Sequence, residues 1–81
     1  MKRILTPKAV KNYTDAPEDI RKAFDKQVMF LLQNLRHPSL HAKKYDETNN
    51  IWQARVSQGW RFYFAIERDC FTILSIKQHP K

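Results

Sequence analysis

The second half of the chain contains three segments in which apolar and polar side chains alternate: Ile51-Trp52-Gln53-Ala54-Arg55-Val56, Trp60-Arg61-Phe62-Tyr63-Phe64-Ala65-Ile66 and Phe71-Thr72-Ile73-Leu74-Ser75-Ile76-Lys77. Because successive side chains of a strand point to opposite faces, this alternation predicts three strands of one sheet. The apolar face is expected to carry Trp52, Ala54, Val56, Phe62, Phe64, Ile66, Leu74 and Ile76. The polar face collects Gln53, Arg55, Arg61, Tyr63, Ser75 and Lys77, and His79 if the alternation continues.

Turn-forming residues at 57–59 and 67–69 separate these segments, which predicts an antiparallel meander. The short segment 2–5 is expected to add a fourth strand. Residues 39–50 are mostly polar, and they are interpreted as a connection between the helical half and the meander.

Two helices are expected between the first strand and this connection. Thr6 followed by Pro7 is typical of a helix start, and the first helix is predicted to run to about Tyr13. A second helix is predicted to open within 15–19, with Pro17 at its first position, and to end near Arg36. It carries an apolar stripe formed by Ile20, Ala23, Phe24, Gln27, Val28, Leu31 and Leu35.

The predicted fold is therefore α+β, in the order β-α-α-β-β-β. Two N-terminal helices pack on one face of a small, mainly antiparallel four-stranded sheet, because their apolar stripe needs a partner. The polar face of the sheet is left open.

Length and charge limit the function classes. At 81 residues we expect a single domain, 1–81, and the net charge of +7 with a pI near 9.9 favours polyanionic partners, of which nucleic acid is the commonest. No segment resembles a signal peptide or a membrane span, so a cytoplasmic protein without membrane contact is expected. The single Cys70 cannot form an internal disulfide, and no cofactor is expected.

Arg55 and Arg61 are the main candidates for chemistry on the open face. They are near cross-strand neighbours if the hairpin is centred on residues 58–59, and two guanidinium groups so placed can clamp one phosphate. The alternative is that both are merely solvated, or paired with Glu67 or Asp46.

His79 is the side chain near this face that suits general acid or base catalysis, although a terminal histidine is often a solvated bystander. His37 and His41 are weaker candidates for this role. They flank Pro38, do not share a helix face and predict no metal site. Four further residues are candidates for substrate binding through stacking or phosphate contacts: Lys43, Lys44, Tyr63 and Lys77.

Several motifs together resemble the RelE/ParE toxin superfamily: His37-Pro38-Ser39-Leu40, Lys43-Lys44, Ile51 to Val56, Trp60 to Phe64 and Ile76-Lys77-Gln78-His79. The resemblance covers nearly the whole chain and is greatest for the RelE-type mRNA interferases of type II toxin–antitoxin systems. It implies a ribosome-dependent endoribonuclease that makes the ribose 2′-OH attack the adjacent phosphate. By the same resemblance Arg61 would stabilise the transition state, Arg55 would assist, and His79 would be the general acid.

The resemblance leaves the general base open among Asp46, Glu47, Lys43 and Lys44. It implies mRNA and the ribosome as targets and a cognate, acidic antitoxin as the partner in a hetero-oligomer. Two alternatives remain: a ParE-type inhibitor of DNA gyrase that cleaves no RNA, and a degenerate member that only binds its antitoxin.

Overall fold

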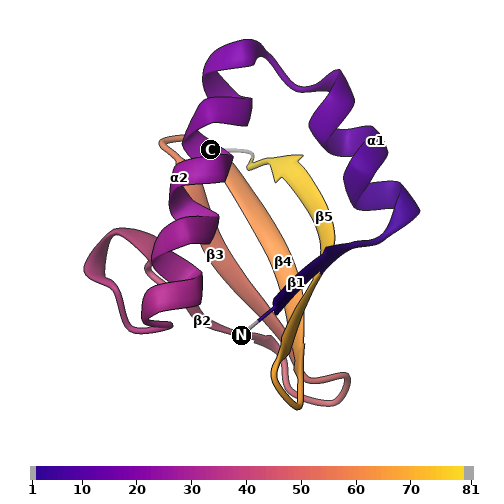
Figure 1. The fold of residues 1–81 in the computed structure, drawn as a ribbon, viewed down its shortest axis with the longest axis vertical. Helices are drawn as coiled ribbons and strands as arrows, with labels where there is room; N and C mark the ends of the chain where they lie inside the picture. Colours follow the sequence, from indigo (N-terminus) through magenta and orange to yellow (C-terminus); the bar gives the residue numbers. More distant parts are fainter. Residues whose placement is uncertain (1, 80–81) are drawn as a thin grey trace.

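The structure is a computed structural model that describes residues 2–79. Two helices and a short 3-10 turn precede a meander of strands (Figure 1). The elements are β1 (Lys2–Leu5), α1 (Pro7–Asp15), α2 (Glu18–Gln33), η1 (Pro38–Leu40), β2 (Lys43–Asp46), β3 (Ile51–Ser57), β4 (Trp60–Glu67) and β5 (Cys70–Gln78). Among these residues no helix is both long and apolar enough to cross a membrane.

Residues 2–79 form a sheet of five strands in the order β1-β5-β4-β3-β2. Strand β1 runs parallel to β5, and the other neighbours are antiparallel, so the prediction of an α+β fold with a mainly antiparallel sheet is confirmed. The predicted strand number was wrong, because β2 lies within the segment interpreted as a connection. Its sequence, Lys-Lys-Tyr-Asp, has no apolar alternation, and the strand holds the sheet edge because Lys43, Lys44 and Asp46 pair with β3.

Local signals explain where the helices begin. The Thr6 hydroxyl accepts a hydrogen bond from the Ala9 N–H (3.1 Å) and donates one to the Leu74 carbonyl (3.1 Å), so the helix cap is also tied to β5. Helix α1 runs two residues beyond the predicted end at Tyr13. Helix α2 starts just after Pro17 and ends at Gln33, before the predicted end near Arg36.

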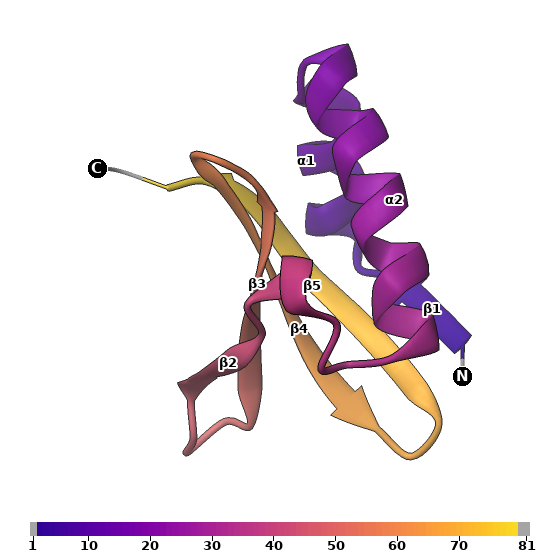
Figure 2. The ribbon, with the colours of Figure 1, turned by 90° about the vertical axis from the view of Figure 1, so that its left-hand side faces the viewer.

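Both helices cover the same face of the sheet, as Figure 2 shows, and the core lies between the two layers. Phe62 and Phe64 of β4 are fully buried there, and Phe24 of α2 meets Phe62 edge to face at 5.3 Å between ring centroids. This confirms the predicted apolar face for β3 and β4, and no helix formed by the described residues covers the other face of the sheet.

The prediction of the apolar face was wrong for one residue, Leu74. A bulge in β5 pairs Tyr63 with Ser75 but Phe64 with Ile73, so Leu74 falls out of the alternation. The buried apolar residues of β5 are Phe71, Ile73 and Ile76. Leu74 lies instead on the open face, in a hollow that it shares with Tyr63.

Candidate functional site

The β3–β4 hairpin places two arginines directly opposite each other. Arg55 and Arg61 are paired in register, as the sequence predicted, next to the turn at Gln58 and Gly59. Gly59 has φ of +133°, a conformation that side chains other than glycine's rarely adopt. The tight turn thus brings two cations together at one end of the open face.

Each guanidinium retains unused hydrogen-bond donors. Both side-chain hydrogen bonds that Arg61 makes within residues 2–79 use Nη1, which donates to the carbonyls of Ser57 (3.0 Å) and Trp60 (2.9 Å). The Nε of Arg55 is buried, with no partner among the described residues. Buried donors are normally paired, so Arg55 is prepared for an acceptor that a ligand can supply.

Within residues 2–79 neither Arg55 nor Arg61 forms an ion pair with Glu67 or Asp46, the pairing that was one form of the predicted alternative. The ion pairs within residues 2–79 join Lys11 to Asp15 and Lys22 to Glu18, all on the helices. Two like charges placed opposite each other repel unless an anion lies between them. The pair therefore favours an anionic ligand.

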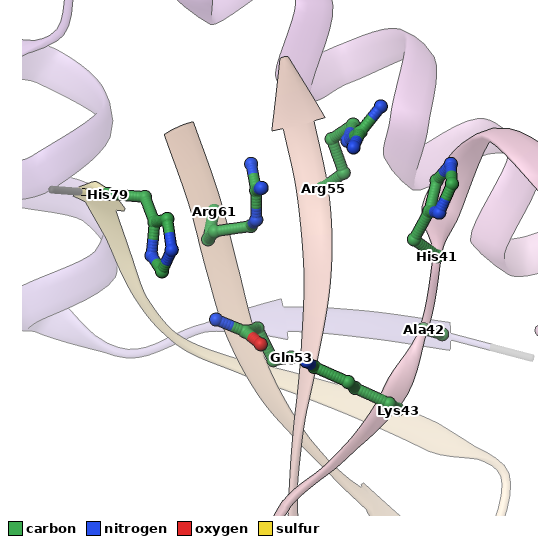
Figure 3. A pocket seen from close by; sticks show the side chains of 7 residues that line it. All are labelled: His41, Ala42, Lys43, Gln53, Arg55, Arg61 and His79. Carbon is green, nitrogen blue, oxygen red and sulfur yellow. The ribbon is translucent and has the colours of Figure 1, made fainter. Parts of the chain in front are cut away.

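A cavity of 410 Å³ opens over this arginine pair (Figure 3). Four of its lining side chains can carry positive charge besides Arg55, and none of the lining residues within 2–79 is acidic. The lining residues are His41, Ala42, Lys43, Gln53, Arg55, Arg61 and His79. We call this cavity the cation cavity; its composition suits a phosphate.

His79 is held at this cavity in spite of its place near the end of the chain. Its backbone N–H donates to the carbonyl of Gly59 at 2.6 Å, which fastens it to the β3–β4 turn, while the residue itself is exposed. In Figure 3 its imidazole lies beside Arg61. The bond to Gly59 argues against a freely moving terminal histidine.

His41 lies at the other side of the cavity, beyond Arg55 in Figure 3. It follows η1 in the left-handed conformation, with φ of +47°, and leads the chain into β2. From the sequence His41 was only a weaker candidate, because only tertiary structure brings this loop next to the hairpin. His37, by contrast, stacks on Phe30 at 3.9 Å between ring centroids and bonds to Ser39, so it has a structural role.

Gln27 of α2 ties the two sides of the cavity together. Its buried side chain donates from Nε2 to the carbonyls of Ser39 (3.0 Å) and Arg55 (2.9 Å), and its Oε1 accepts from the Ser39 hydroxyl (3.1 Å). One amide therefore fixes β3 at Arg55 and also η1, which ends one residue before His41. The sequence placed Gln27 on the core stripe but gave no indication of these bonds.

The other predicted site residues are divided between different places. Lys43 lines the cation cavity, whereas Lys44 points to the other face, where its Nζ lies 5.3 Å from the centroid of the Trp52 ring. Tyr63 and Lys77 line a smaller adjoining hollow. The structure thus brings together Arg55, Arg61, His79 and Lys43, and it separates Lys44 from them.

The acidic candidates for the general base lie outside the cation cavity. Asp46 accepts hydrogen bonds from the side-chain amide (2.8 Å) and backbone N–H (3.1 Å) of Asn49 in the β2–β3 turn. These bonds hold the pKa of the Asp46 carboxyl below its usual range, which makes it a weaker base. Glu47 is exposed in the same turn. In the part of the chain that the structure describes, no group of three or more His, Cys, Asp or Glu side chains could hold a metal ion.

No protein-family model and no curated protein matches this sequence. Solved structures do match it. A YoeB/ParE toxin from Agrobacterium tumefaciens superposes with a TM-score of 0.82 at 10% identity, covering 99% of this chain and 100% of that toxin. The isolated RelE toxin of E. coli gives a TM-score of 0.78 at 13% identity, covering 99% and 85%. A RelB–RelE antitoxin–toxin complex from Methanococcus jannaschii gives 0.72 at 19% identity, covering 93% and 88%. The chain therefore has the fold of the RelE/ParE toxin superfamily.

Proposed function

We propose that this protein is the toxin of a type II toxin–antitoxin pair and that it cleaves mRNA on the ribosome. The observation that carries the proposal is the cation cavity, where two arginines, Lys43 and two histidines converge with no acidic lining residue in the described part of the chain. Such a site binds a phosphodiester and can exchange protons with it. The fold supports the toxin role, because the matching structures include toxins bound to their antitoxins.

The two arginines supply the electrostatic part of the mechanism. When the ribose 2′-oxygen attacks phosphorus, negative charge builds up on the non-bridging oxygens of the phosphate. Arg61 and Arg55 lie opposite each other with free donors, and preplaced cations of this kind stabilise a transition state more than a ground state. We assign Arg61 the main contact and Arg55 a supporting one.

The two histidines supply the proton transfers. They lie on opposite sides of the arginine pair, an arrangement that suits an in-line displacement, in which the attacking and leaving oxygens are far apart (Figure 3). His41 accepts the proton of the 2′-OH as the new P–O bond forms. His79 donates a proton to the 5′-oxygen as the old P–O bond breaks, leaving a 2′,3′-cyclic phosphate and a 5′-OH.

Lys43 also lies at the cavity, and we give it a phosphate contact rather than the role of base. Lysine as a residue type stays protonated at neutral pH, whereas histidine exchanges protons there. Of the four base candidates taken from the sequence, Lys43 is the one that the cavity includes, and His41 was not among them.

The proposed partner is a cognate antitoxin that shields the cation cavity in a hetero-oligomer. The charge of +7 makes an acidic partner electrostatically complementary. Action on ribosomes places the protein in the cytoplasm.

The test is cleavage of a defined mRNA on purified ribosomes, with the new 5′ ends mapped. We expect cuts at codon positions with the wild-type chain, and a loss of roughly 100-fold or more in rate for His41→Ala and for His79→Ala. The two losses differ in pH dependence: His41→Ala changes the acidic limb of the pH–rate profile, because a base acts deprotonated, and His79→Ala changes the alkaline limb.

Other outcomes would point elsewhere. Inhibition of DNA gyrase with intact mRNA would indicate ParE-type action, and antitoxin binding without either effect would indicate a degenerate toxin. Wild-type cleavage by His41→Ala would remove His41 from the mechanism and return the role of base to Lys43.

A further inference from the structure

The open face carries a second hollow next to the cation cavity, and its chemistry is different. It has a volume of 150 Å³ and is lined by Tyr45, Ile51, Tyr63, Leu74, Ser75 and Lys77. We call it the aromatic hollow. Four of these side chains present rings or aliphatic groups on a face without a helix, where polar groups would be expected.

The bulge in β5 builds this hollow. A regular strand would send Leu74 into the core, but the extra residue turns it to the open face. Bulges are frequent beside functional sites, where they redirect a side chain. Leu74 is thus not buried in the core but forms an apolar wall beside Tyr63.

Two tyrosines form the other wall. Tyr45 is 62% exposed, and its ring meets that of Tyr63 edge to face at 4.8 Å between centroids. The Nζ of Lys77 lies 5.7 Å from the centroid of the Tyr63 ring, which leaves a cation at the rim. An exposed, braced aromatic face of this kind is what an unpaired nucleobase stacks on.

The two hollows adjoin each other. The Gln53 side-chain amide, which lines the cation cavity, donates to the Tyr63 hydroxyl at 3.1 Å. Tyr45 lies two residues along β2 from Lys43, or roughly 7 Å. One strand of RNA can therefore place a phosphate in the cation cavity and a neighbouring base in the aromatic hollow.

We propose that the aromatic hollow is a nucleobase subsite, in which Tyr45 is the stacking platform for a base of the RNA whose phosphate occupies the cation cavity. The inference rests on the proposed function and extends it from the phosphate to the base. The volume suits a single flat group, since whole small-molecule sites are usually about 300 to 1,000 Å³. The adjacent cations favour a polyanionic chain over a neutral peptide.

The test compares two 2′-O-methyl hexamers, which resist cleavage because the nucleophile is blocked: one intact, and one of equal length and charge from which every base is absent. Binding is measured by fluorescence anisotropy. The wild type is expected to bind the intact hexamer about 5- to 100-fold more tightly, the range that stacking of one base supplies. Tyr45→Ala should abolish this difference without changing the affinity for the abasic hexamer, and Tyr45→Phe should retain it.

Met29→Ala is the matched control, because Met29 is 59% exposed on α2 and lines neither hollow. It should behave as the wild type. Equal affinity of the wild type for both hexamers would overturn the base subsite and leave the phosphate site intact. An unchanged preference in Tyr45→Ala would also overturn it, and would assign the hollow to another occupant such as an antitoxin segment. Failure to bind either hexamer would contradict both the subsite and the proposed phosphate site.

Discussion

The two faces of the sheet are built from the same strands but obey different rules. On the helix-covered face the side chains are apolar and buried, and they pack against α1 and α2. On the open face the same strands present Arg55 and Arg61, which are half-buried and have no acidic partner among residues 2–79, although burial of unpaired charge is unfavourable. The helix-covered face stabilises the fold, whereas the open face lowers the stability in exchange for a site that can bind a ligand.

This contrast predicts that substitutions on the two faces separate stability from activity. The largest loss of stability is expected for Phe62→Ala. Phe62 is fully buried in the core, where its ring meets those of Phe24 and Phe64. The free energy of unfolding should fall by about 3 to 5 kcal/mol, measured by urea denaturation. A loss of this size is close to the whole stability of such a small domain. If the free energy of unfolding fell by less than 1 kcal/mol, the assignment of Phe62 to the centre of the core would be refuted.

On the opposite face, Arg61→Ala should reverse this pattern. We expect the rate of mRNA cleavage on ribosomes to fall by 100-fold or more, since loss of a preplaced donor costs about 3 kcal/mol in the transition state. The free energy of unfolding should change by only about 1 kcal/mol, because the side-chain hydrogen bonds of Arg61 within the described residues go to two carbonyls beside the turn.

Arg61→Lys is the matched variant, because it keeps the charge but loses the planar fork. It should recover part of the rate. Full activity of Arg61→Ala in a folded protein would remove the arginine pair from catalysis.

Gln27 joins the two faces, so its substitution should affect both stability and cleavage. In Gln27→Leu the carbonyls of Ser39 and Arg55 lose their donor while the volume is kept. We expect a loss of about 1 to 3 kcal/mol in unfolding free energy, together with slower cleavage, because β3 and η1 are no longer held together.

Gln33→Leu is the control for this change, since Gln33 is exposed at the end of the same helix. It should alter neither property by much. Normal activity of Gln27→Leu, measured at a temperature where the variant is fully folded, would show that the Gln27 bonds do not position the site.

The sequence predicted those parts of the molecule that repeat with a period. Alternation in β3 and β4 gave the helix-covered face and the opposition of Arg55 and Arg61, both confirmed. The alternation failed as a guide where backbone pairing or tertiary contact determines the structure. Strand β2 pairs without an apolar pattern, and the β5 bulge breaks the alternation at Leu74. His41 was only a weaker candidate for the same reason: it lies in a loop, and tertiary contacts, among them the bond from Gln27 to Ser39, bring that loop to the cavity.

The smallest expected effect compares the two faces of the sheet at two adjacent lysines. Strand β2 sends Lys43 to the cation cavity and Lys44 to the face that carries Trp52, although both are exposed lysines with the same charge. Overall attraction of RNA should be equal for the two lysines, but only Lys43 is placed to contact a phosphate.

Binding of the 2′-O-methyl hexamer at several salt concentrations can separate these contributions. The slope of log affinity against log salt should become shallower by about 0.7 in Lys43→Ala, the value for one lost contact to a single strand. Lys44→Ala should leave the slope nearly unchanged. Equal slopes for the two variants would mean that the charge of β2, and not the face on which a lysine lies, governs the contact with RNA.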